Sequence, residues 1–191
     1  MTSADPQDGV WLLPTLLPAD LLTVVQCYVN LRLASGTMPR EPGRANAYAI
    51  YGDPLVESLF GLLTPRVSRV LTRAVAPSYG YLRVYLAGSE LAPHVDRETC
   101  EYTLSLAILG MLDGADWPLH ARDLSGRELQ QSLMPGDGVL MRGREVTHWR
   151  KILRSGWAAY AFLHWVEQRQ PDVQRFDGRP GLGFQVVRHA P

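Results

Sequence analysis

Two residues of metal-binding types lie two positions apart near the middle of the chain. His94 and Asp96 follow an alternating apolar run, which predicts an extended strand leading into them. Side chains at positions i and i+2 of a strand point to the same face, so the imidazole and the carboxylate can converge on one point. Two imidazoles and one carboxylate form the facial triad that holds non-haem Fe(II) and leaves coordination positions open. The pair therefore needs a second histidine from elsewhere.

His148 is the second histidine that we expect in this site. It follows a Pro-Gly-Asp turn at 135–137 and lies several expected hairpins beyond His94. Such a separation suits a barrel in which different strands bring their ligands to one mouth. Three ligands would leave room for O2 and an organic co-substrate. His120 and His164 lie in apolar segments, where a structural or supporting role is more typical than metal ligation.

Three helices are expected to precede the strands. The first runs from about Asp20 to Leu33, with an apolar stripe at helical spacing. Asp53-Pro54 predicts a second helix start, because a carboxylate at the N-cap and a proline at the first helical position favour one. Thr64-Pro65 repeats the signal and predicts a third helix that ends near Val75.

The rest of the chain is typical of β structure. Glycine-containing turns separate the candidate strands, which are 81–86, 101–109, 117–121, 129–133, 138–142 and 157–166. Pro118 predicts that the third of them lies at a sheet edge. Helices followed by many short strands indicate an α+β sandwich or barrel with helices on one outer face. We expect a single domain over 1–191, with a helical part over about 19–76, a β core over about 79–167 and a C-terminal loop over 168–191.

Composition limits the possible partners and location. The 191 residues are 46% hydrophobic, which is ample for a core, and 19 basic residues balance 19 acidic ones. This balance favours neither nucleic acid nor an anionic membrane as a partner. Cys27 and Cys100 are too few for a disulfide framework, and we expect free thiols in a soluble cytoplasmic protein with no membrane span. Oligomeric state is left open.

Several segments together resemble the Fe(II)/2-oxoglutarate-dependent oxygenase superfamily, and most closely its prolyl-hydroxylase-like bacterial members. The segments are 81–85, His94-x-Asp96-Arg97-x-x-Cys100-Glu101-Tyr102, Gly136-Asp137, His148-Trp149-Arg150 and Phe162-Leu163-His164. The resemblance covers about residues 64–166. It implies a double-stranded β-helix core of the jelly-roll or cupin-like kind. It also implies iron bound by His94, Asp96 and His148.

The sequence departs from this family where the co-substrate should be anchored. Family members usually carry Arg or Lys about ten residues beyond the distal histidine, but residues 155–160 contain no basic residue. A dianion in a partly buried pocket still needs a cation or several donors. Arg150 is our first candidate, since position i+2 from His148 shares its face. The other candidates are Tyr85 and Arg154 for the co-substrate, and Arg83, Arg97 and Trp149 for the substrate.

Three functions follow, in order of preference. The first is 2-oxoglutarate-dependent hydroxylation or oxidation of a small molecule or amino-acid-like metabolite, with Fe(II) and O2. The second is an iron oxygenase of the same fold that uses no 2-oxoglutarate, which the missing distal cation would explain. The third is a non-catalytic β-barrel binding protein in which His-x-Asp is fortuitous.

Overall fold

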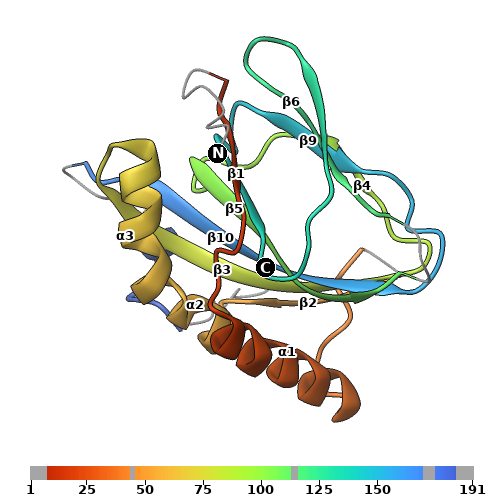
Figure 1. The fold of residues 1–191 in the computed structure, drawn as a ribbon. Helices are drawn as coiled ribbons and strands as arrows, with labels where there is room; N and C mark the ends of the chain where they lie inside the picture. The colour runs from red at the N-terminus through yellow and green to blue at the C-terminus, as the bar shows by residue number, and fades with distance from the viewer. Residues whose placement is uncertain (1–7, 44–45, 113–115, 170–174, 184–191) are drawn as a thin grey trace.

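The computed structural model describes residues 8–43, 46–112, 116–169 and 175–183 (Figure 1). Its helices are α1 (Ala19–Ala34), α2 (Pro54–Ser58), α3 (Phe60–Leu71) and the short 3-10 turn η1 (Arg175–Gly178). Its strands are β1 (Val10–Leu13), β2 (Ala47–Tyr51), β3 (Val75–Leu86), β4 (Leu91–His94), β5 (Tyr102–Met111), β6 (Leu119–Arg122), β7 (Glu128–Gln131), β8 (Gly138–Met141), β9 (Thr147–Arg150) and β10 (Trp157–Glu167).

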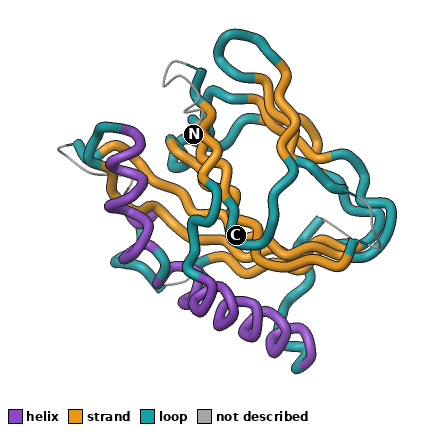
Figure 2. Tube along the Cα trace, viewed as in Figure 1, coloured by secondary structure: helices purple, strands orange, loops and turns teal. Residues whose placement is uncertain are grey.

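The strands form two antiparallel sheets. The larger has the order β1-β8-β5-β10-β3-β2, and the smaller has the order β4-β9-β6-β7. Figure 2 shows the two sheets as separate layers of strands, with the helices on the outer side of the larger one. This arrangement confirms the expected α+β fold with a double-stranded β-helix core and helices on one face.

The alternation of side chains along β3 explains why the larger sheet has two different faces. Leu82 and Val84 are fully buried and belong to the main hydrophobic core, together with Leu63 and Val67 of α3. Arg83, which lies between them, and its neighbours Tyr81 and Tyr85 point to the other face, toward the smaller sheet. Sequence alternation thus separates a helix-covered apolar face from an inner face that carries polar and aromatic groups.

Asp53 begins α2 as expected. Its Oδ1 accepts hydrogen bonds from the backbone N–H groups of Leu55 and Val56, both at 3.0 Å, and Pro54 occupies the first turn. Tyr28 of α1 donates to the other carboxylate oxygen at 2.6 Å. The cap therefore also ties two helices together.

The helix start predicted at Thr64-Pro65 is wrong. Helix α3 begins at Phe60 and ends at Leu71, with Pro65 inside it, and Val75 already belongs to β3. A proline this near the N-terminal end removes only one intrahelical hydrogen bond. The Thr64 hydroxyl accepts a hydrogen bond from the Trp165 indole at 2.9 Å instead of capping a helix.

All six candidate strands are present with shifted bounds, and four more strands lie outside the candidate ranges. Strands β1 and β2 lie in segments expected to be a lead-in and a loop, while β4 and β9 carry the two candidate histidines. The edge position predicted for β6 is wrong, because it pairs with β7 and β9, and Pro118 precedes it. In the expected C-terminal loop, the described residues 175–183 contain η1, and 184–191 lie outside the described residues. No described helix is both long enough and apolar enough to cross a membrane.

Candidate metal centre and cavity

Strand pairing brings the two histidines together. His94, the last residue of β4, is the register partner of His148 on β9, and their ring centroids are 4.3 Å apart. Asp96 lies beyond the end of β4, so the expected strand geometry for His94 and Asp96 is wrong. A hydrogen bond of 2.8 Å from the Asp96 N–H to the carbonyl of Gly143 positions the carboxylate instead.

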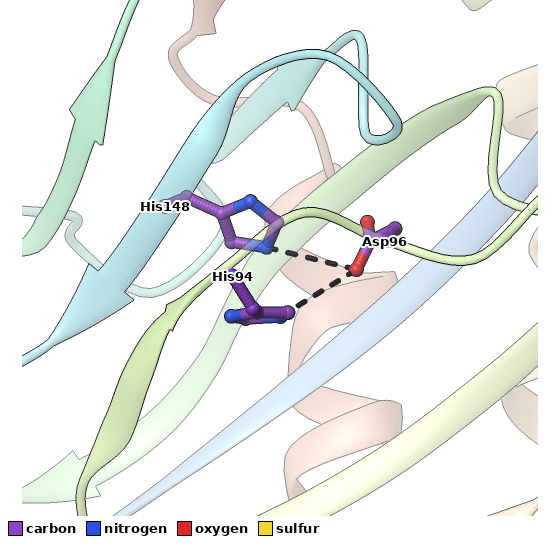
Figure 3. A group of neighbouring side chains, drawn as sticks. All are labelled: His94, Asp96 and His148. Atoms are coloured by element: carbon purple, nitrogen blue, oxygen red, sulfur yellow. Dashed lines mark ion pairs between the residues drawn. The ribbon is translucent and has the colours of Figure 1, made fainter.

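The three side chains point toward one another (Figure 3). Asp96 Oδ1 lies 3.6 Å from His94 Nε2 and 3.7 Å from His148 Nε2. One potential ligand atom from each residue lies within 4.8 Å of the other two. Atoms at these separations can surround one ion with metal–ligand distances of about 2 Å. The residues therefore have the chemistry and spacing of a facial triad.

Backbone contacts set the tautomer of both rings. The Nδ1 atoms of His94 and His148 lie 2.9 Å from the carbonyl of Ala92 and 3.0 Å from that of Val146. A carbonyl only accepts, so each Nδ1 carries the proton and each Nε2 presents its lone pair to the site. Burial lowers the pKa of His148, which favours the neutral ring that binds metals.

A short hydrogen-bond chain supports the carboxylate. The Thr103 hydroxyl donates to Asp96 Oδ2 at 2.5 Å, and His164 Nδ1 lies 2.9 Å from the same hydroxyl oxygen. Because Thr103 has only one proton to donate, His164 must be the donor in the second bond. Burial acts to raise the pKa of Asp96, but the neighbouring His94 ring and these contacts outweigh it and lower the pKa to about 2. Asp96 is therefore ionised, and its Oδ1 takes no part in this hydrogen-bond chain and points toward the two histidines.

A cavity of about 1000 Å³ opens beside the three side chains. Two ion pairs lie in its wall. Arg83 contacts Glu41, and Arg97 Nη2 lies 2.7 Å from Asp177. The aromatic lining residues are Tyr51, Tyr79, Tyr81 and Phe162. The cavity thus combines a candidate metal centre with charged and aromatic groups that can bind a small polar molecule.

Arg150 is a buried cation on the same face of β9 as His148. The residue is 2% exposed, and its guanidinium lies 4.0 Å from the ring centroid of Tyr160 and 4.9 Å from that of Trp117. Nη1 donates to the Trp117 carbonyl at 2.7 Å, while Nε has no hydrogen-bond partner. Within the described part of the chain, no carboxylate forms an ion pair with Arg150. A buried cation of this kind suits an anionic ligand.

The other predicted residues divide into two groups. Arg83 and Arg97 line the cavity, whereas Arg150 does not. Tyr85 is fully buried and accepts a hydrogen bond from Arg83 at 3.0 Å, and it too lies outside the lining. Arg154 is exposed in the turn before β10.

Trp149 faces away from the metal-binding side chains. It follows His148 on β9, and its ring stacks on His120 with centroids 5.5 Å apart. It is not a lining residue of the cavity.

The sequence did not single out Thr103, Glu41 or Asp177 as site residues. Thr103 could have been found from its place on the alternating strand that follows the His-x-Asp motif. Glu41 and Asp177 lie far from the motif in the sequence and carry no local signal. Burial acts to raise the pKa of Asp177, but hydrogen bonds from Tyr51 and Arg97 lower it, so this carboxylate is ionised.

Comparison with known proteins establishes the fold independently. No protein-family model matches the sequence, and no curated protein matches it in sequence. Solved structures do match. The prolyl-4-hydroxylase of Pseudomonas putida has a TM-score of 0.69 at 14% identity, over 84% of this chain and 94% of that one. An oxidoreductase of the 2OG-Fe(II) oxygenase family from Burkholderia pseudomallei has a TM-score of 0.66 at 13% identity, over 90% of this chain and 88% of that one.

A third similar structure contains bound ligands. HygX from Streptomyces hygroscopicus, with nickel, 2-oxoglutarate and hygromycin B bound, has a TM-score of 0.63 at 13% identity, over 85% of this chain and 84% of that one. At these identities the comparison shows a shared fold, and that fold is the one that the sequence motifs imply.

Proposed function

We propose that this protein is a non-haem Fe(II) oxygenase that uses 2-oxoglutarate and O2 to oxidise a small molecule or amino-acid-like metabolite. The observation that carries the proposal is the group His94, Asp96 and His148, with potential ligand atoms within 4.8 Å of one another. The fold supports the proposal, because the similar structures include a prolyl-4-hydroxylase and HygX with 2-oxoglutarate bound.

The donor set fits Fe(II). Two neutral imidazole nitrogens and one carboxylate oxygen form the set that non-haem iron oxygenases use, and three ligands leave positions open for exogenous molecules. Backbone carbonyls orient both rings, and Thr103 orients Asp96, so the ligands need little reorganisation. With 2-oxoglutarate, the iron would supply the redox chemistry by which O2 is activated.

Arg150 is the residue that fits the far carboxylate of the co-substrate. Its buried guanidinium has an unpartnered Nε and no ion-pair partner in the described ranges. A dianion there would form charge-assisted hydrogen bonds with a group that otherwise bears an uncompensated charge. Arg83 fits this role less well because Glu41 already pairs with it. A buried cation without a carboxylate partner among the described residues also favours 2-oxoglutarate dependence over the oxygenase that needs no co-substrate.

The chain's own groups would bind and orient the reactants and limit water. Asp96 is ionised, and burial of the His148 side chain, which is 6% exposed, lowers the pKa of its ring, so both are held in the protonation states that bind a metal. The aromatic lining would exclude water from part of the cavity. We further propose a cytoplasmic location, which the two free thiols Cys27 and Cys100 support.

An anaerobic titration tests iron and co-substrate together. Purified protein with Fe(II) and 2-oxoglutarate should develop a visible charge-transfer band, and turnover should release succinate. His148→Ala should lose Fe(II) binding. Arg150→Gln should retain Fe(II) binding and lose at least tenfold in 2-oxoglutarate affinity, because a charge-assisted contact is removed.

The matched control for Arg150→Gln is Arg154→Gln. The same substitution is made four positions away, on an exposed side chain, and 2-oxoglutarate affinity should stay within twofold. Oxygen uptake with iron and substrate alone would support the oxygenase without co-substrate. Absence of stoichiometric Fe(II) affinity would contradict both oxygenase proposals and favour a binding protein.

A further inference from the structure

A charged pair in the cavity wall joins two segments of the chain. One is the metal-site loop, residues 95–101 between β4 and β5, and the other is the C-terminal segment, residues 175–183. Arg97, the residue after Asp96, donates from Nη2 to Asp177 at 2.7 Å. Tyr51 also donates to Asp177. The Arg97 side chain is 52% exposed, whereas the Asp177 side chain is only 7% exposed, and both residues line the cavity. The Arg97 guanidinium lies 4.5 Å from the ring centroid of Tyr79, another lining residue.

Asp177 is held in place by a buried ion pair two residues away. Arg179 Nη2 lies 2.6 Å from Glu57 Oε1, with the two side chains 3% and 1% exposed. Arg179 also donates to the Ser78 carbonyl at 3.1 Å, and its guanidinium lies 5.0 Å from the Tyr51 ring centroid. Asp177 itself has a φ of 57°. A non-glycine residue in this left-handed conformation is uncommon and persists where its surroundings hold it. The carboxylate is therefore a fixed part of the cavity wall.

Charge balance constrains what the cavity can bind. The described lining residues include three carboxylates, those of Glu41, Asp96 and Asp177, and two guanidiniums, those of Arg83 and Arg97, which leaves one negative charge with the histidines neutral. The two charges of Fe(II) and the two of 2-oxoglutarate would cancel, and Arg150, which is outside the cavity lining but would bind the co-substrate, would supply the remaining positive charge. A substrate with net charge would thus leave an uncompensated charge in a partly buried site, which is costly.

We propose that Arg97 and Asp177 bind the head group of a zwitterionic substrate, that is, a free α-amino acid or a close analogue. This inference rests on the proposed function, because it concerns the substrate of that reaction. A substrate carboxylate would pair with Arg97, and a substrate ammonium would pair with Asp177. Each member of the existing pair then keeps an oppositely charged partner, and two charge-assisted contacts replace one.

The test uses the complete protein as its anaerobic complex with Fe(II) and 2-oxoglutarate. The probes are the free L-amino acids, each compared with its Nα-acetyl derivative and its α-carboxamide, and binding is read from the change in the charge-transfer band. At least one free amino acid should bind at least tenfold more tightly than both of its derivatives. This comparison needs no variant protein.

Two variants separate the two contacts. Asp177→Asn should remove the preference for the free amine over the N-acetyl derivative while retaining the preference for the acid over the amide. Arg97→Gln should do the reverse. A merely structural effect would weaken all probes alike, and Asp177→Glu should restore part of the amine preference. The control variant is Arg122→Gln. Arg122 forms an exposed ion pair with Glu128, also at 2.7 Å, and its substitution should change neither preference.

The outcomes of this test are distinct from those of the functional test. If the charge-transfer band never forms, the proposed oxygenase is contradicted. If the band forms and no free amino acid alters it, or if the derivatives bind as tightly as the parent amino acids, the zwitterion inference is overturned and the oxygenase stands. Retention of both preferences in both variants would likewise overturn the assignment to Arg97 and Asp177.

Discussion

Hydrogen bonds around the metal-binding atoms define this site as much as the three ligand types do. The rings of His94 and His148 are each fixed by a backbone carbonyl two residues earlier in the chain. Asp96 has no such local partner and depends on Thr103, a residue of β5 in the larger sheet. The carboxylate is thus the ligand whose orientation depends most on packing between the sheets.

The first prediction concerns the Thr103 hydroxyl. Thr103→Val keeps the branched shape of the side chain but removes the hydrogen bond to Asp96 Oδ2. Loss of such supporting contacts typically lowers metal affinity by about 10–100-fold, and we expect a loss in this range. Anaerobic Fe(II) titration measures it.

Thr103→Ser is the matched control, because serine keeps the hydroxyl, and its Fe(II) affinity should stay close to that of the unmodified protein. Equal affinity in the valine variant would show that Asp96 is oriented without Thr103.

At the scale of elements, the turn between β8 and β9 determines how close the metal-site loop can approach. Gly143 accepts a hydrogen bond from the Asp96 N–H, and its own N–H donates to the Glu101 carbonyl at 3.0 Å. A Cβ atom placed there would lie 2.5 Å from Thr103 Oγ1 and 2.6 Å from Asp96 Oδ2. The absence of a side chain at this position is therefore what lets the turn pack against the site.

The second prediction follows from that contact. Gly143→Ala should lower the free energy of unfolding by about 1–3 kcal/mol, as overpacking does. It should also weaken Fe(II) binding, because the new methyl group displaces the Thr103 and Asp96 oxygens. Urea denaturation and Fe(II) titration measure the two effects.

Gly61→Ala is the comparison for this variant. Gly61 lies in α3, and a Cβ there meets no atom within 4 Å. Alanine is the better helix former, so this change should be neutral or stabilise by up to about 1 kcal/mol, with Fe(II) affinity unchanged. A harmless Gly143→Ala would contradict the close approach described for this turn.

At the scale of the whole molecule, the C-terminal segment contributes Asp177 to the cavity wall. The Glu57–Arg179 pair joins this segment to α2, and Glu57 Oε1 also accepts a hydrogen bond from the Gly80 N–H at 2.9 Å. Three parts of the chain that are distant in sequence therefore meet at one buried carboxylate, and their packing places Asp177 in the cavity wall.

The third prediction concerns this buried pair. Glu57→Gln should lower the free energy of unfolding by about 3–5 kcal/mol, because it leaves the Arg179 charge buried and uncompensated. Arg73→Ala breaks the more exposed pair with Glu167 and should cost less than about 1 kcal/mol. Urea denaturation of both variants measures the difference. Similar small costs in both would show that the C-terminal segment is not anchored through Glu57.

The sequence by itself determined the metal-binding residue types, most of the strands and the helix cap at Asp53. These features depend on local chemistry, namely side-chain alternation, turn residues and a carboxylate before a proline. It also indicated the double-stranded β-helix, because the motifs around His94 and His148 resemble those of a known superfamily. The helix start misplaced at Thr64 shows the limit of such local signals, since α3 already begins at Phe60 and the Thr64 hydroxyl bonds to the Trp165 indole instead of capping a helix.

Only the tertiary structure decided which charges meet. Strand register placed His94 opposite His148, and a turn hydrogen bond, not strand geometry, positioned Asp96. Burial left Arg150 without an ion-pair partner among the described residues, while the C-terminal segment brought Asp177 to Arg97. The physical reason is that pairing between distant segments depends on how two sheets and a returning chain pack, and no local pattern in the sequence records that packing.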